Sequence, residues 1–184
     1  LLNKKKDKKD LFKIYKNLNI SFFTYSRIAL FKILEFHNKK VKQTICIPSL
    51  ICRDILSSIN NLNYKIVFYE VDEGLNPILT NNIEIDIVLI VNYFGFAQNL
   101  KNFQEFINKN KCITIEDNSH GFLSRDLNGN LLGTRLDYGI ISIYKSLNTF
   151  NGSILINNTN NIVKDYKIYK KFNIAYFIKK LIYF

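Results

Sequence analysis

Short apolar stretches alternate with helical patterns along this chain, and that alternation limits what it can fold into. Several of the stretches are apolar throughout, which is typical of strands covered by helices on both faces. The predicted strands are residues 44–48, 65–71, 85–92, 112–117, 138–143 and 153–157. Helical spacing of apolar residues is found in segments 24–37, 50–62 and 99–110. We therefore predict an α/β fold of three layers, a mainly parallel sheet between helices. Thr24 or Ser26 is expected to cap the first helix.

The chain has 184 residues, of which 47% are hydrophobic, enough for one packed domain. We expect a basic leader over residues 1–20, the domain over 21–160 and an amphipathic helix over 161–184. The sequence contains no methionine, so we expect a fragment. The last segment is basic and aromatic. We interpret it as a linker to a missing small domain or an interface helix, with peripheral membrane contact as the alternative.

The net charge of +11 raises the question of a polyanionic partner. Nucleic-acid binding requires basic residues gathered on one face or stripe, whereas the lysines here are scattered along the chain. The sequence is also rich in Asn, Ile, Tyr and Phe, which indicates a general compositional bias. We therefore expect no nucleic-acid partner.

Three cysteines, Cys46, Cys52 and Cys112, form no metal-binding or disulfide pattern. This usage favours a reducing cytoplasm. No apolar run reaches the length of about 18 residues that a membrane-spanning helix needs, and the first residues lack the apolar stretch of a signal peptide.

Polar residues follow three of the predicted strands. In a parallel sheet the carboxyl ends of the strands share one edge, where ligands bind. Asp117, His120, Ser142 and Lys145 are therefore expected to meet there. Lys145 follows an apolar strand so closely that we expect its side chain to be shielded from water. A buried ammonium is costly unless it is paired or used chemically.

A desolvated lysine can act as an amine nucleophile toward an aldehyde, and pyridoxal 5'-phosphate (PLP) is the cofactor that exploits this chemistry. Asp117 suits the task of keeping the cofactor's ring nitrogen protonated. The hydroxyl of Ser142 and the backbone amides of Ser26 and Arg27, at a helix start, suit its phosphate. The residue types thus form a complete set for PLP.

Six stretches in this order, over roughly residues 20 to 160, resemble the DegT/DnrJ/EryC1/StrS family of sugar aminotransferases. They are "YSRIAL", "IPSLIC", "VNYFG", "IEDNSHG", "LGTRLDYGIISIYK" and "NGSIL". The resemblance implies the large domain of a PLP-dependent transferase with its small domain absent. It also implies that Lys145 forms the Schiff base with PLP and that Asp117 contacts the pyridine nitrogen, as the catalytic pair. His120 would lie near the phenolic oxygen and Ser142 would bind the phosphate.

Three features differ from the family's pattern. Lys145 comes three residues after Ser142, and this interval is shorter than in many members. Cys52 stands where many members place an aromatic ring on the cofactor, so His120 would have to supply the stacking partner or none exists. Ser26 replaces a frequent glycine, which restricts close backbone approach to the phosphate.

The resemblance implies an aminotransferase that acts on a nucleotide-linked keto sugar in surface-polysaccharide or amino-sugar biosynthesis. Glutamate is the common amino donor in the family, and its sites are built from two subunits, so we expect a homodimer. The alternative is a truncated, inactive remnant that serves as a binding module. A basic nucleic-acid or lipid binder is the least favoured of the three.

Each site residue also has a purely structural interpretation. Lys145 alone could be a chance lysine at a strand end, Asp117 a turn former or helix cap, and His120 a satisfied core histidine. The ordered motifs around them favour the cofactor site. We predict that Tyr93 and Phe94 shape the wall of its pocket.

Overall fold

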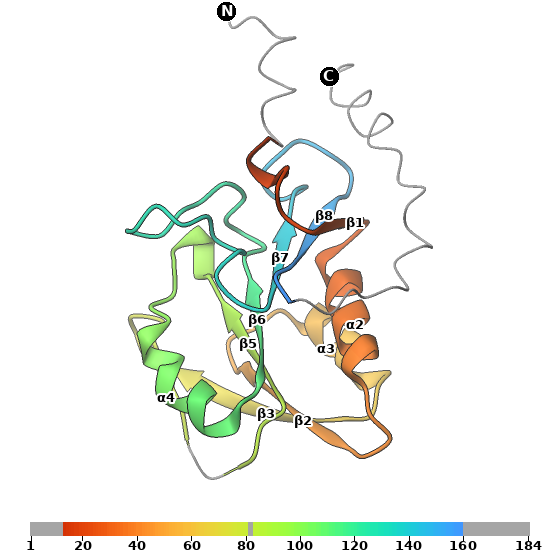
Figure 1. The fold of residues 1–184 in the computed structure, drawn as a ribbon, viewed down its shortest axis with the longest axis vertical. Coiled ribbons are helices and arrows are strands. Elements are labelled where there is room, and N and C mark those ends of the chain that lie inside the picture. Colours follow the sequence, from red (N-terminus) through yellow and green to blue (C-terminus); the bar gives the residue numbers. More distant parts are fainter. Residues whose placement is uncertain (1–12, 81–82, 160–184) are drawn as a thin grey trace, which may run out of the picture.

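The computed structural model describes residues 13–80 and 83–159. In this part of the chain, eight strands form one sheet in the order β1-β8-β7-β6-β5-β2-β3-β4 (Figure 1). The strands are β1 (Ile20–Phe23), β2 (Gln43–Pro48), β3 (Tyr64–Val71), β4 (Pro77–Ile78), β5 (Ile87–Val91), β6 (Ile113–Asp117), β7 (Tyr138–Ser142) and β8 (Ser153–Asn157). All six predicted strands are confirmed within a few residues.

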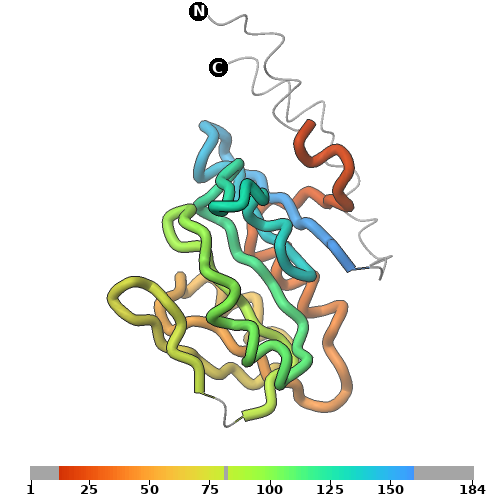
Figure 2. Tube along the Cα trace, turned by 60° about the vertical axis from the view of Figure 1, so that its left-hand side comes forward, coloured from red at the N-terminus to blue at the C-terminus, as the bar shows by residue number. Residues whose placement is uncertain are grey.

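The centre of the sheet is parallel and its edges are antiparallel. β3, β2, β5, β6 and β7 run in parallel, with crossovers between them. β8 pairs antiparallel with β7, β1 with β8 and β4 with β3. β1, which the sequence did not predict, places Ile20 opposite Ile156. The first described residues therefore lie beside the last strand, red next to blue in Figure 2.

Helices cover both faces of the sheet, so the predicted three-layer α/β fold is confirmed. The helices α2 (Ser26–His37) and α3 (Arg53–Asn60) lie on one face and α4 (Lys101–Asn110) on the other (Figure 1). Two short 3-10 turns are η1 (Lys13–Tyr15) and η2 (Tyr93–Gly95). The residue before α2 is Tyr25, and no side chain caps this helix. The predicted cap by Thr24 or Ser26 is wrong, because Ser26 is already helical and its hydroxyl contacts Ser153 instead.

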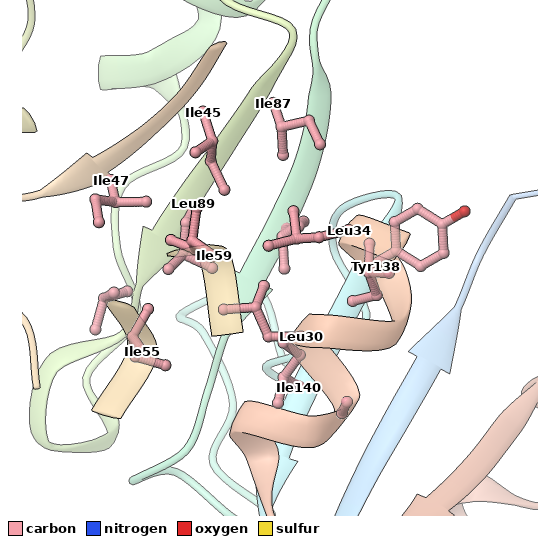
Figure 3. Packing of buried hydrophobic residues seen from close by; sticks show 14 of the residues in the cluster. Leu30, Leu34, Ile45, Ile47, Ile55, Ile59, Ile87, Leu89, Tyr138 and Ile140 are labelled. Atoms are coloured by element: carbon pink, nitrogen blue, oxygen red, sulfur yellow. The ribbon is translucent and has the colours of Figure 1, made fainter. Parts of the chain in front are cut away.

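The larger core lies between the sheet and the pair α2 and α3. Leu30 and Leu34 of α2 and Ile59 of α3 are fully buried against it. Figure 3 shows these side chains meeting Ile45 of β2 and Leu89 of β5. On the opposite face, buried side chains of α4 and the sheet form a second cluster, with Phe103, Phe106, Val88 and Ile90 among its members. This packing fixes the carboxyl ends of β5 and β6 relative to the start of α2.

Packing also extends upstream of the expected start of the domain at residue 21. The side chain of Tyr15 is fully buried and belongs to a cluster with Ile141 and Ile154. The folded domain therefore includes part of the segment predicted as a leader. The helix expected over 161–184 lies outside the described residues. Within the described ranges, no helix has the length and apolar character needed to cross a membrane.

Candidate active site

A cleft of about 290 Å³ opens at the carboxyl ends of the central strands, beside the start of α2. Its volume is at the lower limit of the range typical of small-ligand pockets. Five of the six predicted site residues line it, namely Ser26, Arg27, Asp117, His120 and Lys145. The wall residues Tyr93 and Phe94 also line it, which confirms that prediction.

Asp117 is the last residue of β6 and is only 7% exposed. Side chains alternate along a strand, so Asp117 and Ile115 share the face that packs against α2 and α3. The Oδ1 atom of Asp117 accepts a hydrogen bond from the backbone N–H of Ser119 at 2.9 Å. This bond sets the direction of the carboxylate at the base of the cleft.

Lys145 lines the same cleft, but its side chain is exposed. The expectation that this amine is shielded from water is wrong for the described chain. β7 ends at Ser142, and the N–H groups of Ser146 and Leu147 both bond back to the carbonyl of Ile143. This turn takes Lys145 out of the sheet and onto the rim.

His120 joins Lys145 to the wall of the cleft. Its Nε2 atom lies 3.2 Å from Nζ of Lys145. The His120 ring stacks on Phe94, with centroids 6.2 Å apart and planes 12° apart. Burial, followed by the charge of Lys145, lowers the pKa of His120 below its ordinary value. The imidazole is therefore neutral at pH 7, and its Nε2 can accept a hydrogen bond from the ammonium of Lys145.

Phe94 occupies an unusual backbone conformation. Its φ of 53° lies in the left-handed region, which a bulky residue rarely adopts. Gly95 follows with φ of 83°, and a Cβ there would come within 3.1 Å of the Gly121 backbone. The chain therefore turns sharply after β5 and passes close to the loop that carries His120, which brings the two rings together.

Ser142 is placed differently from the other predicted residues, since it does not line the cleft. It is 1% exposed, and its hydroxyl has no hydrogen-bond partner among the described residues. Ser142 lies opposite Ser153 in the β7–β8 ladder, and the Oγ of Ser153 is 3.2 Å from the Oγ of Ser26. Directly paired residues share a face of the sheet. Three serine hydroxyls thus gather near the start of α2.

The start of α2 supplies the remaining donors. The first amides of a helix, here those of Ser26 and Arg27, have no partner within the helix and attract anions. The Arg27 guanidinium is engaged elsewhere, 3.2 Å from Oδ2 of Asp54 and 4.4 Å from the centroid of the Tyr25 ring. The contribution of Arg27 to a bound phosphate would therefore come from its backbone amide.

These residues fit PLP chemically. The cleft offers an amine, a carboxylate and a helix start. The hydroxyl of Ser142 is buried without a partner among the described residues and lies outside the lining of the cleft, so its bond to the phosphate stays a prediction. Cys52 also lines the cleft, but its thiol provides no ring to stack. His120 and Phe94 are the aromatic pair next to Lys145.

Sequence reasoning missed three contributors. Tyr25 and Tyr144 line the cleft and meet edge to face, with ring centroids 6.0 Å apart. Arg135 forms an ion pair with Glu116, directly behind Asp117. The sequence does indicate that Glu116 needs a partner, because this carboxylate lies within an apolar strand and a buried carboxylate is costly unless it is paired.

Comparisons with known proteins give a match only at the level of structure. Neither family models nor curated protein sequences match this chain. Among solved structures, Helicobacter pylori PseC, an aminotransferase involved in the biosynthesis of pseudoaminic acid, superposes with a TM-score of 0.76 at 16% identity over 89% of this chain. The chain has the fold of these aminotransferases.

Two further structures share this aminotransferase fold. A DegT DnrJ EryC1 StrS aminotransferase from Brucella abortus matches 83% of the chain with a TM-score of 0.70 and 16% identity. The E. coli GDP-4-keto-6-deoxy-D-mannose-3-dehydratase, with bound hydrated PLP, matches 82% with a TM-score of 0.68 and 17% identity. The matches cover 46%, 45% and 42% of those chains, in the order named. The chain thus spans less than half of the length of these neighbours, and the fold implied by the sequence motifs is confirmed.

Proposed function

We propose that the cleft binds PLP and that the protein is a PLP-dependent aminotransferase. One observation carries the proposal. Asp117 and Lys145, separated along the sequence, line one cleft at the carboxyl edge of an aminotransferase-type sheet. A carboxylate and a lysine in one cleft are what PLP enzymes require.

Each residue has a defined task. Lys145 would hold the cofactor through its amine and, when free, would move a proton at the reacting carbon. Asp117 would keep the ring nitrogen protonated. The amides of Ser26 and Arg27 and the hydroxyl of Ser142 would hold the phosphate. PLP, when bound, supplies an electron-withdrawing ring that stabilises negative charge on the substrate carbon.

The structural neighbours support a proposal for the substrate class. H. pylori PseC is described as an aminotransferase of pseudoaminic acid biosynthesis, and the E. coli dehydratase is named for a GDP-linked keto sugar. A related dehydratase structure contains a trapped PLP-glutamate geminal diamine. We infer that the complete protein transfers an amino group from a donor such as glutamate to a nucleotide-linked keto sugar. The donor leaves as its keto acid.

The exposure of the cleft supports a homodimer. Leu50 and Phe94 line the cleft and are 52% and 71% exposed, and Lys145 is exposed at its rim. A second copy placed over this rim would bury both apolar side chains and shield the amine of Lys145 from water. We place the protein in the cytoplasm, where its free cysteines Cys46, Cys52 and Cys112 would stay reduced.

Titration of the purified chain with PLP tests the proposal. The visible absorption band of lysine-bound cofactor should saturate at one equivalent and disappear in Lys145→Ala. Lys101→Ala, which removes an exposed lysine of α4, is the matched control and should keep the band. An unchanged band in Lys145→Ala would contradict the proposal.

The inactive-remnant alternative makes a different prediction. A chain that binds PLP through Lys145 yet never transfers an amino group from glutamate to the bound cofactor would be a binding module. The test is to add glutamate and monitor the conversion of bound PLP to its amino form by absorption spectroscopy. Conversion indicates an aminotransferase, and its absence indicates a binding module.

A further inference from the structure

A buried ion pair lies behind Asp117, on the opposite face of the sheet. Glu116 and Asp117 are consecutive residues of β6, so their side chains point to opposite faces. The side chain of Glu116 is 0% exposed and that of Arg135 is 8% exposed. The Nη2 and Nε atoms of Arg135 lie 2.7 and 2.8 Å from Oε1 of Glu116. The backbone N–H of Arg135 donates to Oε2 at 3.0 Å.

The same pair holds the end of β5. The side-chain amide of Asn92 donates to Oε1 of Glu116 at 2.7 Å, and its Oδ1 accepts from Nη2 of Arg135 at 3.1 Å. The backbone N–H of Asn92 donates to the carbonyl of Asp117 at 2.9 Å. Glu116 and Arg135 are therefore linked through Asn92 to the backbone of the residue proposed to contact the cofactor.

The network also reaches the loop that forms the cleft wall. Oδ1 of Asn92 accepts from the backbone N–H of Gln98 at 2.9 Å, and Nη1 of Arg135 donates to the carbonyl of Gln98 at 3.2 Å. These bonds fix both ends of the segment 92–98, which includes Phe94, the ring stacked on His120. One guanidinium thus ties together two strand ends and the wall of the cleft.

We propose that Arg135 and Glu116 are positioning residues for this site, which rests on the proposed function. They hold the backbone of Asp117, from which its carboxylate projects, and the position of the Phe94 wall from the face of the sheet opposite the cleft. The planar fork of arginine is needed, because a lysine ammonium cannot bond Glu116, Asn92 and the Gln98 carbonyl in this geometry. A purely structural pair would affect only stability.

Amide hydrogen exchange in the cofactor-free chain directly tests whether Arg135 and Glu116 hold these segments in place. Glu116→Gln keeps the shape of the side chain and Arg135→Lys keeps its charge. Both are conservative, so that the chain still folds. Both should speed exchange of the Ser119 amide, which bonds Asp117, and the Gln98 amide, which bonds Asn92, by about tenfold. The fully buried Leu30 of α2 should exchange at the wild-type rate. Uniform acceleration, or none at Ser119 and Gln98, would overturn the proposal.

PLP binding supplies the second readout. Both variants should bind PLP at least about tenfold more weakly, because small displacements of a positioned group are costly. They should also shift the pH midpoint of the bound cofactor's absorption in the same direction as Asp117→Asn. Arg125→Lys is the matched control, because Arg125 is an exposed arginine that donates to the Gly129 carbonyl. This variant should change neither the PLP affinity nor the pH midpoint.

Failure of the two proposals is distinguishable. If the wild-type chain shows no PLP band, the proposed function fails while hydrogen exchange still decides whether the pair braces Asp117. If the wild type binds PLP and both variants match its affinity and pH midpoint, the positioning role is wrong.

Discussion

The amine of Lys145 lies 3.2 Å from Nε2 of His120 at the rim of the cleft. Burial and the nearby lysine lower the pKa of His120, which favours the neutral ring, and the Nε2 atom of a neutral ring can accept this hydrogen bond. The bond directs an otherwise exposed amine along the cleft wall. The relationship links the loop after β6 to the turn after β7, which approach only in the folded chain.

Removing the acceptor should slow attachment of the cofactor. We expect His120→Ala to reduce the rate of PLP attachment to Lys145 by about tenfold, because the amine loses its orientation. His120→Gln retains a side-chain acceptor and should react at close to the wild-type rate. Stopped-flow absorption after mixing with PLP measures both. Equal rates for His120→Ala and the wild type would contradict an orienting role.

The hydroxyl of Ser142 gives a prediction with opposite effects on stability and binding. It is buried without a partner among the described residues, so Ser142→Ala should leave the free energy of unfolding unchanged or raise it by up to about 1 kcal/mol. PLP affinity should fall by about tenfold, since a phosphate donor is lost. Denaturant unfolding and PLP titration provide the two measurements.

Ser153→Ala is the matched comparison for Ser142→Ala. Ser153 already has a partner in Ser26 at 3.2 Å, so its removal should cost about 1 kcal/mol of unfolding free energy. A loss of stability in Ser142→Ala equal to that in Ser153→Ala would contradict the description of the Ser142 hydroxyl.

The sequence was sufficient to predict the parallel centre of the fold, because the buried strands are apolar throughout and helical periodicity separates them. It did not predict β1, since "ISFF" is short and becomes a strand only by pairing with β8, far along the chain. The convergence of Asp117 and Lys145 followed from parallel topology.

Other features of the site depend on tertiary contacts that no local pattern encodes. The exposure of Lys145 follows from where the backbone turns after Ser142, which strand propensity does not specify. The ion pair of Glu116 with Arg135 joins residues from different segments. The sequence alone does not identify Arg135 as the partner, because the fold brings the two residues together. The serine pair Ser26 and Ser153 likewise meets only because β8 passes the start of α2.

A substitution at Gly139 of β7 tests how closely this strand packs against the preceding loop, which contains Gly133. A Cβ at this position would lie 1.7 Å from the carbonyl oxygen of Gly133, so the backbone would have to move. We expect Gly139→Ala to lower the free energy of unfolding by about 3 kcal/mol or more. Gly129→Asn is the control, because nothing lies within 4 Å and asparagine tolerates its positive φ. Comparable losses in both variants would contradict the packing.

Acidification should destabilise the chain through His37. Burial lowers the pKa of His37 below its ordinary value of 6.5, and Nε2 lies 2.9 Å from the hydroxyl of Tyr138. As the pH falls below the unfolded-state pKa, the unfolded chain binds a proton that the folded chain does not, so the free energy of unfolding falls until the folded-state pKa is reached. His37→Gln should weaken this dependence, as measured by urea unfolding between neutral and mildly acidic pH. An identical pH dependence would contradict the assignment.

The most direct test of the account is to locate the covalent bond to PLP. Reduction of the PLP-treated chain with borohydride fixes the cofactor to whichever lysine holds it, and peptide mass spectrometry identifies that residue. We expect one modified site, Lys145, with the modification lost in Lys145→Arg and weakened in Asp117→Asn. Modification scattered over surface lysines, with Lys145 no more reactive than the others, would contradict the central claim.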